Sequence, residues 1–198
     1  MIAGRTATLF AVLTLALATA GCLVENEHSI IEKPAAPDKR LVGVWALESD
    51  GSAQVLVLRN RDEDPDRLQS SFVIADRDDA PMASRAAIRF TEIGGRQYFE
   101  ANWRVGEWLP VDPPVRRTFG TYELSGDTLT LCLADPEAFT PVLKSGALTG
   151  FSGIGDSYER RAVIANDTAS LRAYLAKNHF KCTVARTFRR LEGPAQPK

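Results

Sequence analysis

The chain has 198 residues and a formal net charge of −1 at pH 7, from 24 basic and 25 acidic side chains. Nucleic-acid binding needs a concentrated basic surface, so this near-balance of charge argues against that class of function. The length is that of one domain rather than several.

The first 21 residues have the three parts of a secretory signal peptide. Arg5 is the only charged residue before Glu25, an apolar stretch covers 9–18, and small residues end the segment. The alternative interpretation is a transmembrane anchor, which needs about 20 apolar residues. The run here is shorter and rich in Ala and Thr, which favours a signal peptide that is removed.

The segment Ala20-Gly21-Cys22 resembles the lipobox of bacterial lipoproteins, with Thr19 where Leu is commoner. This resemblance implies that Cys22 becomes the first residue and carries a thioether-linked lipid. Two or three acyl chains anchor firmly, because each buried methylene contributes about 0.8 kcal/mol. Leu23, where Asp would imply retention at the inner membrane, implies an outer-membrane location facing the periplasm.

Residues 22–40 are predicted to form a flexible tether, because they contain Pro34, Pro37 and several charges but no apolar period. Residues 193–198 are predicted to be a disordered tail. Between these segments, 41–192 is expected to be a single folded domain.

Alternation of apolar and polar residues dominates this domain, and this is the period of a half-buried antiparallel strand. Residues 97–105 show it best, with Phe99 and Ala101 on one face and Tyr98 and Glu100 on the other. The nine candidate strands cover 41–48, 53–60, 69–76, 85–92, 97–105, 118–124, 127–134, 158–165 and 183–191.

Tight turns join several of these strands in sequence order. Gly94-Gly95 and Gly126-Asp127 supply the positive φ that hairpins require. Because an open sheet of nine strands would leave exposed edges, we expect it to close. The predicted fold class is mainly β: an antiparallel up-and-down barrel of about nine strands with two short helices.

Two helices are predicted to interrupt the strands. Asp135 is expected to cap one that begins at Pro136 and is kept short or kinked by Pro141. Asp167 is expected to cap the other, over 168–178. Its apolar face carries Leu171, Tyr174 and Leu175.

The chain has three cysteines, of which lipidation would consume Cys22. In an oxidising compartment the remaining two, Cys132 and Cys182, suggest one disulfide. It would close a loop of about 50 residues and contribute about 2–4 kcal/mol. The alternative is two buried free thiols.

The opening Gly43-x-Trp45, the hairpin motif over 122–129 and the late pair Arg189-Arg190 resemble those of lipocalin-like bacterial lipoproteins. The resemblance implies a lipocalin-like barrel in which the tryptophan closes one end and an arginine of the last strand packs across its ring. We assign this pair to Trp45 and Arg189, with Arg190 as the alternative.

Metal and phosphate motifs are weak. His28 lies in the expected tether, and His179 beside Cys182 lacks a third ligand, so we expect no metal site. The acidic run 62–66 lacks the glycine and the final glutamate of a calcium loop. The glycine-rich stretch 146–155 matches neither a P-loop nor a dinucleotide fingerprint, and it lacks the second glycine of a serine-hydrolase elbow.

Two groups of side chains remain as candidate binding residues. If the barrel gathers the arginine pairs, they would bind an anionic group; otherwise they are surface charges balanced by acids. These pairs are Arg116-Arg117, Arg160-Arg161 and Arg189-Arg190. Aromatic side chains could line a pocket or pack in the core. They are Tyr98, Phe99, Trp103 and Trp108.

No pair of nucleophile and base can be named, so we expect no enzymatic activity, no catalytic residues and no cofactor. Small barrels can hold one apolar ligand in their mouth. The leading hypothesis is therefore a binding module for a small apolar or amphipathic ligand, anchored to the membrane through Cys22. The alternative is an envelope accessory protein that binds another protein through the barrel exterior. An open interior favours the first hypothesis and a filled one the second.

Overall fold

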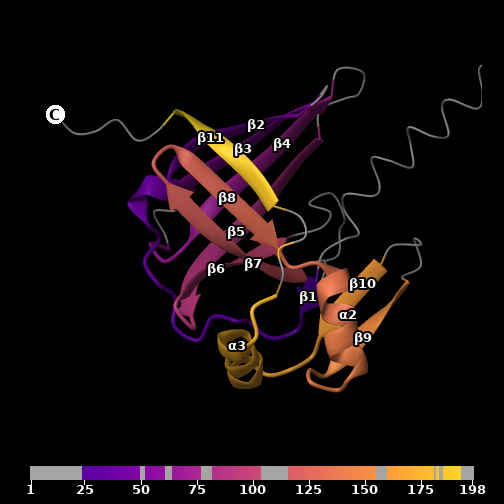
Figure 1. The fold of residues 1–198 in the computed structure, drawn as a ribbon. Coiled ribbons are helices and arrows are strands. Elements are labelled where there is room, and N and C mark those ends of the chain that lie inside the picture. Colours follow the sequence, from indigo (N-terminus) through magenta and orange to yellow (C-terminus); the bar gives the residue numbers. More distant parts are fainter. Residues whose placement is uncertain are drawn as a thin grey trace, which may run out of the picture.

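The computed structural model describes residues 24–49, 52–60, 64–76, 82–103, 116–154, 160–180, 182 and 185–192, which form a mainly β protein (Figure 1). In chain order the elements are β1 (Val24–Asn26), a 3-10 turn (Lys39–Leu41), β2 (Gly43–Ser49), β3 (Ser52–Asn60), β4 (Leu68–Asp76), β5 (Met82–Ile93), β6 (Arg96–Trp103), β7 (Arg116–Ser125), β8 (Thr128–Leu133), α2 (Pro136–Lys144), β9 (Gly150–Ile154), β10 (Arg160–Ile164), α3 (Thr168–Lys177) and β11 (Ala185–Glu192).

Eight of these strands close into an antiparallel barrel. Their order around the ring is β6, β5, β4, β3, β2, β11, β8 and β7, and pairing of β6 with β7 completes it. The predicted fold class, an antiparallel barrel with two short helices, is confirmed. The barrel has eight strands rather than nine because the strand expected over 158–165, which becomes β10, pairs outside the ring with β1 and β9.

The other three strands extend the sheet beyond the barrel. β8 leaves the wall after Leu133, and β1 continues its path beside β7, with Glu25 paired to Thr118. The amide of Val24 donates to the carbonyl of Ala134 at 3.3 Å, where β1 takes the place of β8 beside β7. β10 then pairs with β1, and β9 with β10, which carries the sheet away from the barrel (Figure 1).

The flexible tether expected over 22–40 is wrong from residue 24 onward. Val24 is fully buried, and Ile30 and Ile31 are buried as well. The amide of Ala35 is hydrogen-bonded to β5 at 3.0 Å. Proline and charge content suggested disorder, but the apolar side chains of this segment pack into a core together with side chains of β6, β7 and the two helices, and this burial fixes the backbone.

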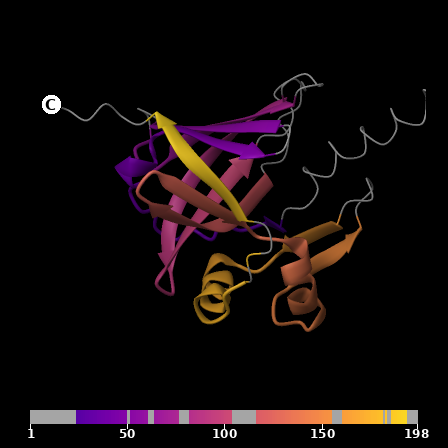
Figure 2. The same cartoon turned by 45° about the horizontal axis from the view of Figure 1, so that its top comes forward.

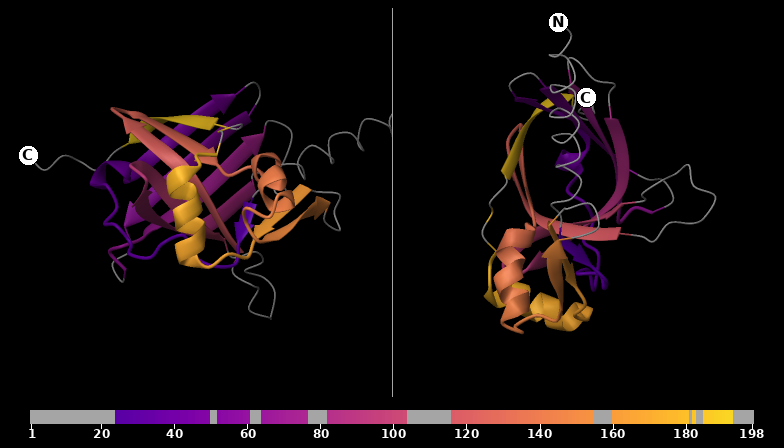
Figure 3. Two further views of the ribbon diagram at one scale, coloured as in Figure 1. Left: turned by 60° about the horizontal axis from the view of Figure 1, so that its bottom comes forward. Right: turned by 90° about the vertical axis from the view of Figure 1, so that its right-hand side faces the viewer.

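Two apolar cores lie on opposite sides of the barrel wall. One lies inside the barrel. The other packs the outer face of β6 and β7 against β1, β10 and the two helices, which form a separate layer beside the barrel (Figure 3). Strand β6 contributes Phe99 and Ala101 to the barrel and Tyr98 to the outer core. The predicted alternation thus holds, but both faces of this strand are buried.

Both predicted helices form. The caps at Asp135 and Asp167 each accept a backbone amide of their own first turn at 2.8 Å. Pro141 lies inside α2, and α3 ends one residue before its expected end. Leu171 and Leu175 of α3 are fully buried, as its predicted apolar face requires.

Cys132 and Cys182 form the expected disulfide, with Cα atoms 5.7 Å apart. The bridge joins β8 to the segment that leads into β11, its neighbour in the barrel. A loop of this length corresponds to a stabilisation of about 2–4 kcal/mol. The signal peptide expected over 1–21, the lipid-attachment residue Cys22 and the tail 193–198 lie outside the described residues.

Candidate functional site

One end of the barrel is closed by a tryptophan and an arginine. The guanidinium carbon of Arg190 lies 4.1 Å from the centre of the Trp45 ring. The indole Nε1 donates to the carbonyl of Leu41 at 2.9 Å. Arg190 also donates to the carbonyls of Val42, at 3.0 Å, and of Arg40. One side chain therefore ties the last strand to the segment that enters the first strand of the barrel.

The arginine of this pair is Arg190, so its assignment to Arg189 is wrong. Alternate residues of a strand face the same side, and Phe188 is buried inside the barrel. Arg190 shares this inward face, whereas Arg189 is exposed. The pair of consecutive arginines does not show by itself which of them faces the barrel interior. The buried Phe188 shows that it is Arg190, two residues later on the same face of the strand.

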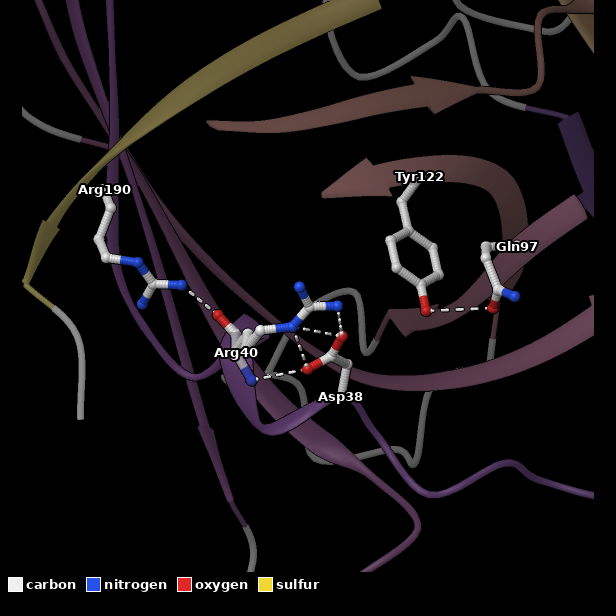
Figure 4. A network of polar contacts seen from close by, with 5 residues as sticks. All are labelled: Asp38, Arg40, Gln97, Tyr122 and Arg190. Atoms are coloured by element: carbon white, nitrogen blue, oxygen red, sulfur yellow. Dashed lines mark hydrogen bonds and ion pairs between the residues drawn. The ribbon is translucent and has the colours of Figure 1, made fainter. Parts of the chain in front are cut away.

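A polar rim lies beside this end (Figure 4). Asp38 accepts hydrogen bonds from Arg40 Nε at 3.0 Å and Nη2 at 2.6 Å. These bonds lower the pKa of the Asp38 carboxyl and raise the pKa of Arg40. Tyr122 donates to Gln97 Oε1 at 3.4 Å, and burial raises the pKa of its phenol. Because the Asp38–Arg40 pair is exposed to solvent, it contributes little stability.

The interior next to this end is nearly filled. The cavity there has a volume of about 20 Å³, little more than the roughly 10–15 Å³ needed for one water. Small-molecule sites measure about 300–1,000 Å³, so this level of the barrel has no room for such a ligand. The lining residues are Leu41, Leu56, Leu58, Ile88, Phe90, Phe99, Tyr122, Leu129 and Leu131.

Polar side chains also face the inside of the barrel. Arg186, two residues before Phe188 and on the same face of β11, donates to Oε1 of Gln54. Ser70 is buried, and its hydroxyl donates to the carbonyl of Ala86 at 3.1 Å. Polar side chains therefore lie on the inward face of the barrel among apolar ones such as Leu58, which lines the cavity and is paired with Ser70.

A buried carboxylate holds the N-terminal segment against the barrel. Glu100, on the outer face of β6, is 2% exposed. It accepts from Asn26 Nδ2 at 3.1 Å, Ser29 Oγ at 2.9 Å and the amide of Ile30 at 2.8 Å. Arg172 of α3 donates to the carbonyl of Ile30 at 2.8 Å. Sequence reasoning missed this cluster, although two adjacent isoleucines within the expected tether were a signal of burial.

The two helices border a groove on the outer layer. α2 and α3 lie next to each other on one side of the barrel (Figure 2), and the groove that both line has a volume of about 400 Å³ and opens to solvent. The lining residues are Pro141, Val142, Ser145, Ala147, Tyr174 and Asn178. None of them is charged, and burial raises the pKa of the Tyr174 phenol, so the groove is neutral and largely apolar.

The arginine pairs do not gather into one anion site within the described ranges. Arg117 donates to the carbonyl of Glu27 at 3.0 Å, and Arg161 pairs with the carboxylate of Glu25 at 3.0 Å. Both engage β1 or the residue after it, whereas Arg190 closes the barrel. These arginines have local partners, as the alternative interpretation expected.

The remaining candidates do not form a site among the described residues. Tyr98 lies in the outer core, Phe99 lies in the barrel, and both histidines are exposed. No described group of three or more metal-ligating side chains lies together. The glycine-rich stretch 146–155 contains β9. Trp108, residues 61–63 and the side chains of Trp103, Arg116 and Arg160 lie outside the described residues.

Comparison of the chain with family models, with curated proteins and with solved structures gave no match. The lipocalin-like resemblance therefore stays a prediction, whereas the eight-stranded barrel is a property of this structure. Among the described residues, no helix has the length and apolar character needed to cross a bilayer.

Proposed function

We propose that this chain is a lipid-anchored, non-enzymatic envelope protein that binds a partner protein through the outside of its barrel. The observation that supports the proposal is a difference in free space. The cavity inside the barrel next to Trp45 has a volume of about 20 Å³, whereas the groove between α2 and α3 has about 400 Å³. The lack of room for a small molecule at this level of the barrel favours the exterior as the binding surface. The chain also places five further elements on that exterior, namely β1, β9, β10, α2 and α3.

The fold of the N-terminal segment bears on how such an anchor would hold the domain. Cys22 precedes the buried Val24 by two residues, and two extended residues span at most about 7 Å. A lipid on Cys22 would therefore hold the barrel at the membrane surface, facing the periplasm if the membrane is the outer one. Radiolabelled palmitate tests this: we expect incorporation into the parent chain and none into Cys22→Ser, and equal labelling of both would refute the anchor.

Photo-crosslinking in intact cells tests the partner. Tyr174, in the groove, is replaced by benzoylphenylalanine, and the same replacement at Tyr122, beside the Trp45 end, is the matched control. We expect one discrete crosslinked product of a different mass from twice the chain at position 174 and none at 122. Equal products at both positions, or none at either, would remove the groove as the binding surface.

The groove also supports a second candidate, binding of a small apolar or amphipathic molecule. It has a volume of about 400 Å³ and opens widely to solvent, so a small molecule would lie in it partly exposed, against walls that are largely apolar. Native mass spectrometry of the chain released from cell membranes distinguishes the two candidates. A bound species of a few hundred daltons that is lost in Val142→Asp supports the small molecule, and a chain free of such a species supports the protein partner.

A further inference from the structure

The described sheet has one open edge, and β9 forms it. The other strands each have neighbours on both sides, because the ring closes through β6 and β7 and the extension runs from β7 through β1 and β10 to β9. Figure 1 likewise shows β9 at the outer border of the extension. An unpaired edge offers its backbone N–H and C=O groups to another strand.

The outward groups can be identified from the ladder with β10. Ala165 donates to the carbonyl of Thr149 at 2.9 Å, and Gly150 is paired with Ile164. In an antiparallel ladder every second pair of facing residues is hydrogen-bonded. Because Thr149 and Ala165 form such a pair, the odd-numbered residues of β9 are hydrogen-bonded to β10. The backbone groups of Gly150, Ser152 and Ile154 therefore point away from the sheet.

The sequence of this edge strand lacks two common protections against pairing. Edge strands commonly carry charged side chains or proline, whereas β9 reads Gly-Phe-Ser-Gly-Ile. Phe151 is 58% exposed, and its Cζ lies 2.6 Å from where a Cβ on Gly153 would be. The ring thus covers a glycine of its own strand, and any larger residue at position 153 would displace it.

We propose that β9 is a self-association surface, on which a second copy of this chain adds its own β9 as an antiparallel strand. With a two-fold axis at Ser152, the two serines face each other as a hydrogen-bonded pair. Phe151 then faces Gly153 of the second copy, and Gly150 faces Ile154 of that copy. Because glycine carries no side chain, the strand of the second copy leaves room for Phe151 at this position.

The same register brings the two Phe151 side chains into diagonal positions across the new ladder. Diagonal neighbours lie about 7–8 Å apart, within reach of aromatic side chains, so each ring shields the other from water. The formal net charge of the chain is −1, so two copies do not repel strongly. A strand with bulky residues at every position would not fit opposite Phe151 in this way, which favours a second copy over an unrelated peptide.

Sedimentation velocity of the full chain in a neutrally buoyant detergent tests the proposal. We expect a monomer–dimer equilibrium that shifts with protein concentration. Ser152→Pro removes an outward N–H while leaving the bonds to β10 in place, so it is expected to be monomeric throughout. Ser152→Thr keeps this N–H and is expected to dimerise as the parent does.

A second pair of variants distinguishes pairing at the β9 edge from nonspecific hydrophobic association. This test does not depend on the proline variant being folded. Phe151→Thr is expected to raise the dimer dissociation constant by about tenfold or more. Leu191→Thr removes the other large apolar side chain that is exposed among the described residues, 63% exposed on β11, and is expected to change the dissociation constant less than about twofold. A parent chain that is monomeric at every concentration, or equal effects of the two variants, would overturn the proposal.

Discussion

The amide of Ile30 donates to the carboxylate of Glu100 at 2.8 Å, across 70 positions of the sequence. Glu100 belongs to the barrel wall, whereas Ile30 belongs to the segment that would follow a lipidated cysteine. This hydrogen bond, with those from Asn26 and Ser29, makes the segment part of the fold. A lipid at its start would therefore be coupled to the barrel rather than separated from it.

The variant Glu100→Gln is expected to lower the free energy of unfolding by about 1–3 kcal/mol, because one acceptor oxygen then remains for the three donors Asn26, Ser29 and Ile30. Hydrogen exchange at the amide of Ile30 should become faster in this variant. The control is Glu92→Gln, whose carboxylate accepts only an exposed bond from Gln97 in the described structure and should change stability by less than about 0.5 kcal/mol. Unchanged exchange at Ile30 would argue that the bond to Glu100 does not hold the segment.

The Trp45–Arg190 contact gives a second prediction. Arg190, whose side chain is 15% exposed, combines a stacked contact with hydrogen bonds to two carbonyls. Arg190→Ala should therefore lower the free energy of unfolding in urea by about 2 kcal/mol. The exposed Arg189→Ala should cost less than about 0.5 kcal/mol. The reverse order of the two losses would restore the assignment to Arg189.

The strands were predictable because their residues alternate, and all nine predicted ranges overlap observed strands. β1 and β9 were missed because a strand of three residues, or one with two glycines among five, carries no clear alternation. The departure of β10 from the barrel depends on tertiary pairing with β1, which no local pattern shows. Whether the interior is hollow depends on how side chains from eight strands fill it, and the sequence alone does not fix this.

Tyr98 gives a prediction about pH. It is fully buried, its hydroxyl has no hydrogen-bond partner among the described residues, and burial raises the pKa of its phenol above the usual 10.0. The folded state therefore favours the neutral phenol. This contribution to stability is complete below pH 10.0 and is lost as the pH rises through the higher folded-state value.

The variant Tyr98→Phe should therefore be as stable as the parent at pH 7, or more stable by up to about 1 kcal/mol, because an unpaired hydroxyl is removed. Above pH 10 the parent should lose more stability than the variant. Urea unfolding at several pH values measures both quantities. A loss of more than about 1 kcal/mol in the variant at pH 7 would mean that the hydroxyl has a partner.

The disulfide gives a fourth prediction. Replacement of Cys132 and Cys182 together by alanine should lower the free energy of unfolding by about 2–4 kcal/mol, because the unfolded chain regains the freedom of a long loop. The disulfide links β8 to the segment before β11, and these two strands are also paired by backbone hydrogen bonds. The barrel itself should therefore persist without the disulfide, with an unchanged circular dichroism spectrum. Equal stability of the two chains would show that strand pairing alone fixes this side of the barrel.

Binding on the outside of the barrel predicts a specific pattern of hydrogen exchange, and this measurement compares the outside with the inside directly. The chain is measured in its native membrane fraction and again after purification. We expect slower exchange in the membrane fraction for 141–147 and 174–178, which border the groove, and no difference in β3, β4 and β5. Protection confined to those barrel strands, with the groove unchanged, would contradict the account.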